Sequence, residues 1–129
     1  MYARGNVLVK NFLMCTDNVK CKLFKSYCSS FYCSQLWCSY NSASFTKLQT
    51  AYNRILRSLF RLDRLDSISQ KCIEYGIDSF KVLIRKAIFS FRNRLLTCEN
   101  TIINCITRST FLSCLLTDKW NRLLFTFSM

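Results

Sequence analysis

The chain has 129 residues, of which 50% are hydrophobic and 20% are charged, so its composition is that of a globular domain rather than a disordered segment. Average usage would give a chain of this length roughly 9 Gly and 6 Pro, whereas this one contains 2 Gly and 0 Pro. Sandwiches and barrels, which need many tight turns, are therefore disfavoured. We expect an all-α protein, a small helical bundle of about five to six helices that forms one domain over residues 1–129.

The charge is strongly positive, with 19 Lys and Arg against 7 Asp and Glu and a net charge of +12. A field of this sign attracts polyanions, which are either nucleic acid or an anionic membrane face. Residues 1–64 carry 10 of the basic and 2 of the acidic residues, so the first half is expected to face the polyanion. No secretory signal and no run of 18 apolar residues is visible. We therefore expect no membrane partner.

Cysteine is frequent and histidine is absent, with 9 Cys and 0 His. The cysteine number is odd and no Cys-x-x-Cys pair occurs, so neither a disulfide framework nor a zinc knuckle is indicated. Small buried thiols in an intracellular, reducing compartment, nucleus or cytoplasm, are the expectation. No metal and no cofactor is predicted.

Polar caps divide the first half of the chain into two expected helices. Thr16, Asp17 and Asn18 precede an apolar-periodic run, which predicts a central, mostly buried helix that continues to about Tyr40. The break at Asn41-Ser42-Ala43-Ser44 then predicts a second long helix, from about Ser44 to Leu62.

The second helix is strongly amphipathic. At 100° per residue its apolar side chains fall within an arc of about 160°, and its basic side chains within about 100° on the other side. No acidic residue occurs from Ser42 to Leu62, whereas a merely solvated face normally mixes both signs. Both a polyanion contact and simple solvation stay open at this point. The basic set is Lys47, Arg54, Arg57, Arg61 and Arg64.

The second half contains three more capped helices and a last short one. On the helix capped by Asp78 and Ser79, Lys81, Arg85 and Arg92 share one narrow face and predict a second cationic edge. The expected helices are a short one from Ser67 to Gly76, then Asp78 to about Thr97, Thr101 to about Leu116, and a final turn or two from Thr117 through Trp120 and Leu124.

Catalytic chemistry is not indicated. Without His, a general base would have to be a perturbed carboxylate, Cys or Lys. The only close carboxylates, Asp63 and Asp66, are expected to pair with neighbours and to cap helix ends. Glycine-rich phosphate loops are missing, since the only glycines are Gly5 and Gly76. The chain is therefore predicted not to be an enzyme.

Several segments resemble one protein family in residue identity and spacing. They are Gly5-Asn6-Val7-Leu8-Val9-Lys10-Asn11-Phe12, Met14-Cys15, Val19-Lys20, Leu23-Phe24-Lys25-Ser26-Tyr27-Cys28, Leu36-Trp37-Cys38, Lys47-Leu48, Ala51-Tyr52-Asn53 and Arg57. The pattern, which extends from Tyr2 to about Ile103, resembles the helical thumb and following segment of reverse transcriptases from non-LTR, LINE-like retrotransposons.

Two departures limit what this resemblance implies. The catalytic aromatic-x-Asp-Asp motif of the family, an RNA-directed DNA polymerase, has no match here, so polymerase activity is not carried over and the chain is expected to be the tail of a longer protein. Family members also commonly have Pro where this chain has Ser29-Ser30, and serine there is expected to let the helix run on.

The predicted function is that of a non-catalytic derivative of such a reverse transcriptase. As in polymerase thumbs, its cationic faces would contact the backbone of an RNA or DNA duplex, without reading sequence. One alternative is a structural fragment without binding activity, which packs on a missing polymerase core or self-associates. Another is a peripheral protein on anionic lipid, ranked last because the apolar face is no wider than core packing needs.

Overall fold

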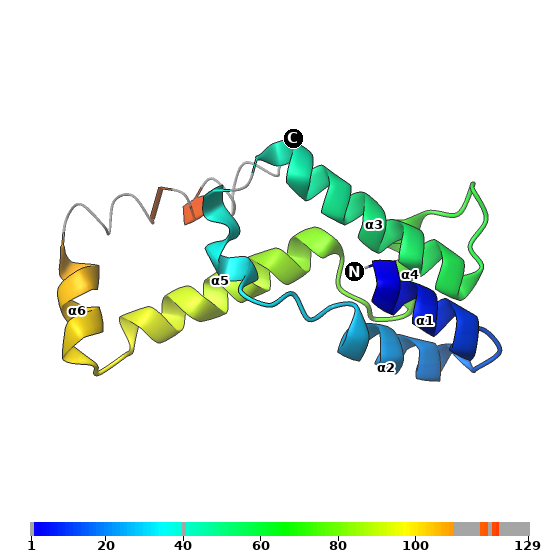
Figure 1. The fold of residues 1–129 in the computed structure, drawn as a ribbon, viewed down its shortest axis with the longest axis horizontal. Coiled ribbons are helices and arrows are strands. Elements are labelled where there is room, and N and C mark those ends of the chain that lie inside the picture. Colours follow the sequence, from blue (N-terminus) through cyan, green and yellow to red (C-terminus); the bar gives the residue numbers. More distant parts are fainter. Residues whose placement is uncertain (1, 40, 110–116, 119, 122–129) are drawn as a thin grey trace. The chain divides into compact units, whose positions relative to one another are not determined.

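The computed structural model describes residues 2–39, 41–109, 117–118 and 120–121, and none of these lies in a β-strand (Figure 1). The expected all-α class is confirmed for this part of the chain. Its helices are, in order, α1 (Tyr2–Phe12), α2 (Asp17–Tyr27), the 3₁₀ helix η1 (Ser34–Ser39), α3 (Ser42–Phe60), α4 (Ile68–Glu74), α5 (Phe80–Leu96) and α6 (Thr101–Arg108).

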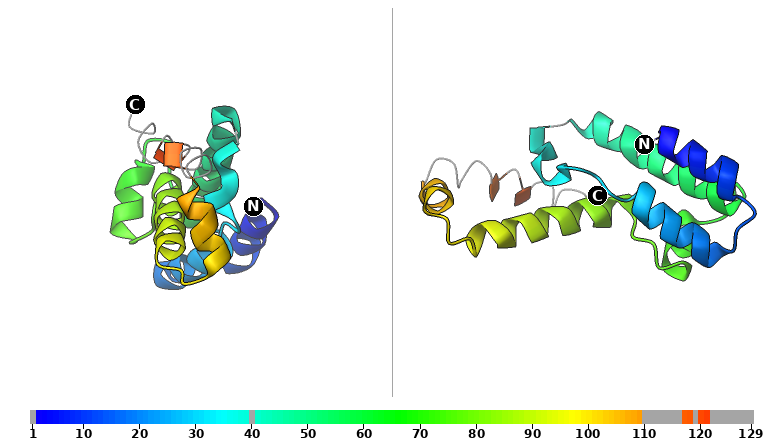
Figure 2. Two further views of the ribbon diagram at one scale, coloured as in Figure 1. Left: turned by 90° about the vertical axis from the view of Figure 1, so that its left-hand side faces the viewer. Right: turned by 60° about the horizontal axis from the view of Figure 1, so that its bottom comes forward.

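The chain divides into two compact units. Unit 1 comprises Met1–Tyr32 and Tyr40–Leu83, and unit 2 comprises Cys33–Ser39 and Ile84–Met129. The expectation of a single domain stays a prediction. In unit 1, α3 is the central helix, because α1, α2 and α4 all contact it (Figures 1 and 2).

Helix α1 is not among the helices predicted from the sequence. Its buried residues are Gly5 and Leu8, which are three positions apart, and Gly5 lies against Ile55 of α3. A Cβ atom at Gly5 would lie 2.6 Å from both Cγ1 and Cδ1 of Ile55. The missing side chain at Gly5 therefore lets the two helices approach closely, at the usual cost of glycine in a helix interior.

Helix α2 begins where the sequence predicts, after Thr16, but ends at Tyr27 rather than near Tyr40. The expectation that Ser29 and Ser30 let the helix run on is therefore wrong. The backbone N–H groups of Cys28 and Ser29 both bond to the carbonyl of Phe24, which closes the last turn. The chain then leaves the helical path, and Cys33 has a positive φ of 54°.

The expectation that this helix is mostly buried is also wrong. Only Lys20, Cys21 and Phe24 are buried on α2, and the side chain of Tyr27 is 54% exposed. One face of α2 packs on α1 and α3, and the rest meets solvent.

The predicted helix from Ser44 to Leu62 is confirmed as α3, shifted by two residues at each end. The side chain of Asn41 caps it by accepting a hydrogen bond of 2.9 Å from the backbone N–H of Ser44. Its end is set by Arg61, which adopts the left-handed conformation at φ 50° and donates its backbone N–H to the Arg57 carbonyl.

Aromatic side chains close the core of unit 1. The ring centroid of Tyr52 lies 5.0 Å from that of Phe24 and 6.0 Å from that of Phe80. Phe31 packs edge-on against Phe80 with a centroid distance of 5.3 Å. The hydroxyl of Tyr52 donates a 2.6 Å hydrogen bond to the carbonyl of Asp78, so the polar end of this buried ring is satisfied.

The later caps agree with the sequence analysis. Ser67 accepts from the backbone N–H of Gln70 before α4, and Gly76 follows it at φ +59°. Ser79 precedes α5 and accepts from the backbone N–H of Val82. Asn100 caps α6, which begins at the expected Thr101.

Helix α6 ends at Arg108, earlier than the expected Leu116. The predicted helical residues 110–116 and the predicted end near Leu124 lie outside the described residues. Trp120 is buried in unit 2 and packs edge-on against Phe91 with a centroid distance of 6.0 Å.

Candidate polyanion-binding surface

Two of the basic residues that are predicted to contact a polyanion lie on the exposed face of α3, away from its buried face. Lys47 and Arg54 are both exposed, and their seven-residue spacing places them on one face about 10.5 Å apart along the helix axis. Thr50 lies between them, with its hydroxyl donating to the carbonyl of Thr46. The opposite face is buried and consists of Phe45, Ala51, Tyr52, Ile55, Leu56, Leu59 and Phe60.

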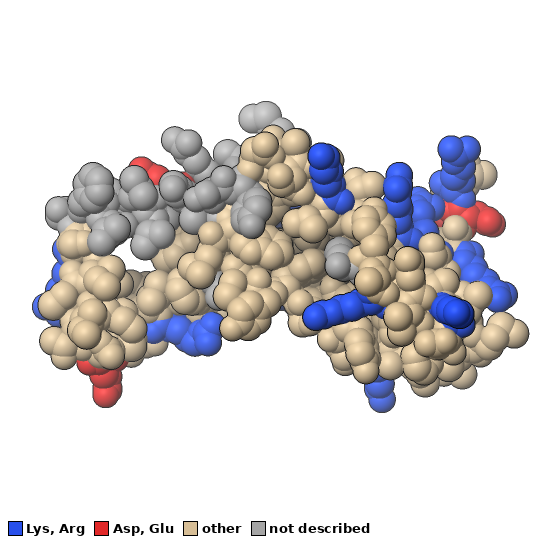
Figure 3. All heavy atoms as spheres, in the orientation of Figure 1, with Lys and Arg blue, Asp and Glu red and all other residues tan. Residues whose placement is uncertain are grey.

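Figure 3 shows basic side chains projecting from the visible face of unit 1, with few acidic side chains among them. Of the seven acidic residues in the chain, none occurs between Ser42 and Leu62. Lys20 forms an ion pair with Asp17, and Lys71 forms one with Glu74, and neither pair involves α3. Lys47 and Arg54 therefore present positive charge to solvent without a neutralising partner on their own helix.

Arg57 is half-buried, and its side chain forms hydrogen bonds with the backbone of its own chain. Its guanidinium donates to the backbone carbonyls of Asp63 and Asp66, the latter over 3.0 Å. The Asp66 carboxylate in turn accepts a 2.9 Å hydrogen bond from the backbone N–H of Asp63. This arrangement braces the loop between α3 and α4, and it occupies donors of a residue that the sequence analysis assigned to polyanion contact.

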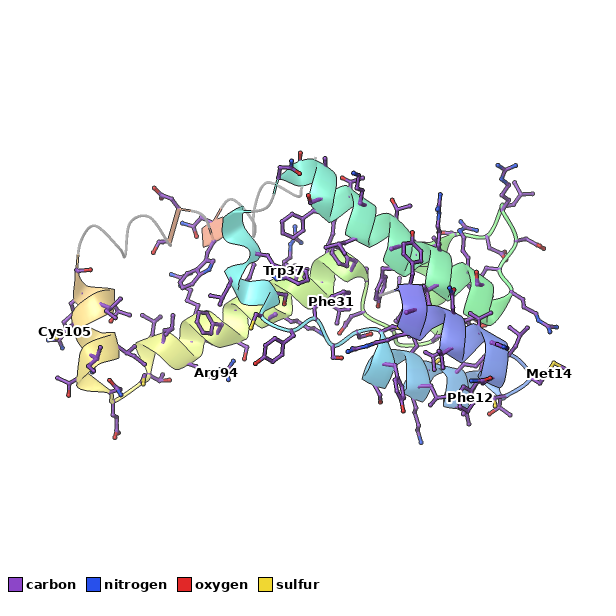
Figure 4. All side chains as sticks on the ribbon, in the orientation of Figure 1. Phe12, Met14, Phe31, Trp37, Arg94 and Cys105 are labelled. Carbon is purple, nitrogen blue, oxygen red and sulfur yellow. The ribbon has the colours of Figure 1, made fainter. Side chains whose placement is uncertain are left out.

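Arg61 and Arg64 lie beyond the end of α3, so the expectation that all five basic residues share one helical face is wrong. The physical reason is the left-handed turn at Arg61, which takes the following chain off the helical path. One guanidinium nitrogen of Arg61 lies 3.6 Å from the sulfur of Met14, which projects from the loop between α1 and α2 (Figure 4). Both arginines are exposed.

The second predicted cationic edge, on α5, is less accessible than α3. Lys81, Arg85 and Arg92 are all half-buried. The Nε atom of Arg85 is buried and has no hydrogen-bond acceptor among the described residues. Arg92 lines an apolar cavity in unit 2. The α5 edge therefore stays a prediction, with less exposed charge than α3 offers.

The described thiols do not form a metal site. No group of three or more Cys, Asp or Glu side chains comes together among the residues that the structure describes. Burial raises the pKa of the Cys21, Cys28 and Cys72 thiols, which disfavours the reactive thiolate.

The Asp66 carboxylate bonds to its neighbour Asp63 within the loop, as a local role implies. The expectation that these two residues cap helix ends is wrong, because Arg61 is the C-cap of α3 and Ser67 caps α4.

Sequence reasoning missed one feature, the cavity of unit 2. Two of its lining residues, Ile103 and Ile106 on α6, are apolar and three positions apart, and they were expected simply to form part of a helix. That they border a cavity could not be inferred without the position of Trp120.

Within the described ranges, no helix combines the length and the apolar character needed to cross a bilayer. No family model, curated protein or solved structure matches the chain. The case for a function therefore depends on the geometry of the chain itself.

Proposed function

We propose that unit 1 binds the sugar-phosphate backbone of a nucleic-acid duplex through the exposed face of α3, without catalysis. The observation that carries this proposal is the pair Lys47 and Arg54, exposed on one face of a helix that is buried on the other and has no acidic residue. Arg61 and Arg64, exposed just beyond the helix, extend the positive surface.

The chemistry of these side chains fits phosphate contact rather than base recognition. Lys and Arg donate to phosphate oxygens and release condensed counterions, which yields affinity that is independent of sequence. The resemblance to the thumb of non-LTR reverse transcriptases supports the same role, since such thumbs lie near a template–primer duplex. The protein would then be a non-catalytic derivative of that polymerase.

A second candidate function is packing on a missing polymerase core or on another copy of the chain. Exposed apolar side chains in unit 2 favour it, since Phe89 is 59% exposed, Leu96 66% and Ile102 70%. Large exposed apolar patches commonly mark association surfaces. Size-exclusion chromatography with static light scattering distinguishes a monomer from such an assembly.

Fluorescence anisotropy with a labelled 20-base-pair DNA duplex and an RNA–DNA hybrid of the same length, each from 50 to 300 mM salt, tests the binding proposal. Two phosphate contacts predict a slope of log K against log salt of about −1.8, and four predict about −3.6. The double variant Lys47→Glu/Arg54→Glu should lose most of the binding and bring the slope closer to zero by about 1.8.

The control variant is Lys22→Glu/Lys25→Glu, which changes the net charge equally at two exposed positions on α2. It should weaken binding much less than the α3 variant. Equal weakening by the two variants would show a response to bulk charge rather than to the α3 face, and a flat salt response would contradict backbone binding altogether.

A further inference from the structure

Unit 2 contains a cavity of about 300 Å³ between α5, α6, η1 and the two residues Thr117 and Trp120. Its apolar wall includes Leu36, Phe91, Leu95, Ile103 and Trp120. This volume lies at the lower end of the range of about 300–1,000 Å³ that is usual for small-molecule sites. The cavity is partly open to solvent, so a ligand can enter it.

The cavity has donors but no acidic group. Arg92 is the charged residue in its lining, and it has no acidic partner within the described part of the chain. Trp120 is only 6% exposed, and its indole N–H is inaccessible to solvent, so it does not face the cavity. The half-buried Arg92 is therefore the cationic group that the polar end of a ligand could reach.

We propose that this cavity binds a small amphiphilic anion, with its apolar chain against Leu95 and Ile103 and its carboxylate on Arg92. The guanidinium of arginine pairs with a carboxylate through two parallel hydrogen bonds, which a single hydroxyl cannot form. Arg92 is one of the basic residues expected to contact phosphate, whereas its apolar surroundings suit a single anionic head with an attached chain. The proposal uses no residue of α3 and is independent of duplex binding.

Decanoate, below its critical micelle concentration, is the probe. The chain has two tryptophans, so Trp37→Phe leaves Trp120 in the cavity wall as the only tryptophan. Saturable change of its fluorescence reports binding in the full-length chain. Decanol, which has the same chain without the charge, should bind about tenfold or more weakly, because it cannot form the bidentate ion pair.

Two variants and one control locate the site. Arg92→Gln should weaken decanoate binding about tenfold while leaving decanol unchanged, and Leu95→Phe should weaken both ligands by filling the cavity. Arg94→Gln is the matched control, since Arg94 is exposed on another face of α5 and does not line the cavity (Figure 4). Circular dichroism checks that each variant is folded.

Three results would overturn the proposal: no saturable binding, equal affinity for decanoate and decanol, or equal effects of Arg92→Gln and Arg94→Gln. A concentration-dependent dimer that excludes decanoate would assign the cavity to a second copy of the chain instead. Because Lys47→Glu/Arg54→Glu should leave decanoate binding intact, failure of this proposal and failure of duplex binding are separable.

Discussion

The two units use their apolar residues differently. In unit 1, the rings of Phe24 and Tyr52 are fully buried and lie in edge contact, and Leu8 and Leu59 are also almost inaccessible to solvent. In unit 2, the described buried apolar residues are Ile84, Ile88 and Trp120, while other large apolar side chains line a cavity or are exposed. Both units expose some large apolar side chains, such as Leu65 in unit 1 and Ile102 in unit 2. Unit 1 nevertheless has a close-packed core, whereas the small described core of unit 2 borders a cavity.

The polar groups show the same contrast. The hydroxyl of Tyr52, buried in unit 1, donates to the Asp78 carbonyl. The indole N–H of Trp120, buried in unit 2, has no acceptor among the described residues. An unsatisfied buried donor costs roughly 1–3 kcal/mol. This cost falls on unit 2, whereas the paired hydroxyl of Tyr52 adds no such cost in unit 1.

The largest expected effect comes from removing a ring from each unit in turn. Phe24→Ala should reduce the free energy of unfolding by about 3–5 kcal/mol, because the fully buried ring leaves a cavity in close-packed surroundings. Phe91→Ala removes the same ring from a half-buried position beside an existing cavity and should cost clearly less. Urea denaturation followed by circular dichroism measures both. Equal losses would contradict the contrast between the units.

The contact between α1 and α3 should give the next largest effect. Gly5→Ala places a Cβ atom within 2.6 Å of the branched side chain of Ile55, so a helix must shift or a rotamer must strain. The expected loss is about 1–3 kcal/mol, although alanine has the better helix propensity. Ile55→Ala relieves the clash, so in a double-mutant cycle the two losses should not add. Additive losses would show that the close approach does not limit stability.

Much of the helical framework could be predicted from the sequence. The caps at Asn41, Ser67, Ser79 and Asn100 are local signals, because each side chain bonds to a backbone N–H two or three residues away. The amphipathic pattern of α3 is equally local. These features need no knowledge of the rest of the fold.

The features that sequence reasoning missed depend on residues far apart in the chain. Helix α1 packs through Gly5 against Ile55, fifty positions away, and its short pattern did not indicate that contact. Arg57 fits the cationic stripe by periodicity, but carbonyls exposed by the turn after α3 accept its hydrogen bonds. Helical spacing identifies which residues share a face, but not which of them the neighbouring loop will bind.

Alkaline pH should produce a smaller, graded loss of stability in unit 1. Burial raises the pKa of Tyr52 and of the Cys21, Cys28 and Cys72 thiols. Above about pH 8.5 for Cys and 10 for Tyr, the unfolded chain loses protons that the folded chain retains. The unfolded state then binds fewer protons, so the free energy of unfolding falls as pH rises. The urea concentration at the midpoint of unfolding, measured between pH 7 and pH 10.5, reports this fall. The midpoint of a Tyr52→Phe variant should fall less over the same pH range. A constant or rising midpoint would contradict the raised pKa values.

Thiol labelling perturbs the protein least, because it needs no substitution. Its rate reports the local unfolding that exposes a cysteine in each unit. Cys105 is exposed on α6 in unit 2, whereas Cys72 is buried on α4 in unit 1. With an aromatic disulfide reagent at pH 8, Cys105 should react at nearly the rate of a free thiol, while Cys72 should react only through opening of the core, orders of magnitude more slowly. Phe24→Ala should then accelerate labelling of Cys72 in proportion to the stability lost, and leave Cys105 unchanged. If Cys72 labels quickly in the parent chain, its burial does not protect it, and the closed core that distinguishes unit 1 from unit 2 is not maintained in solution.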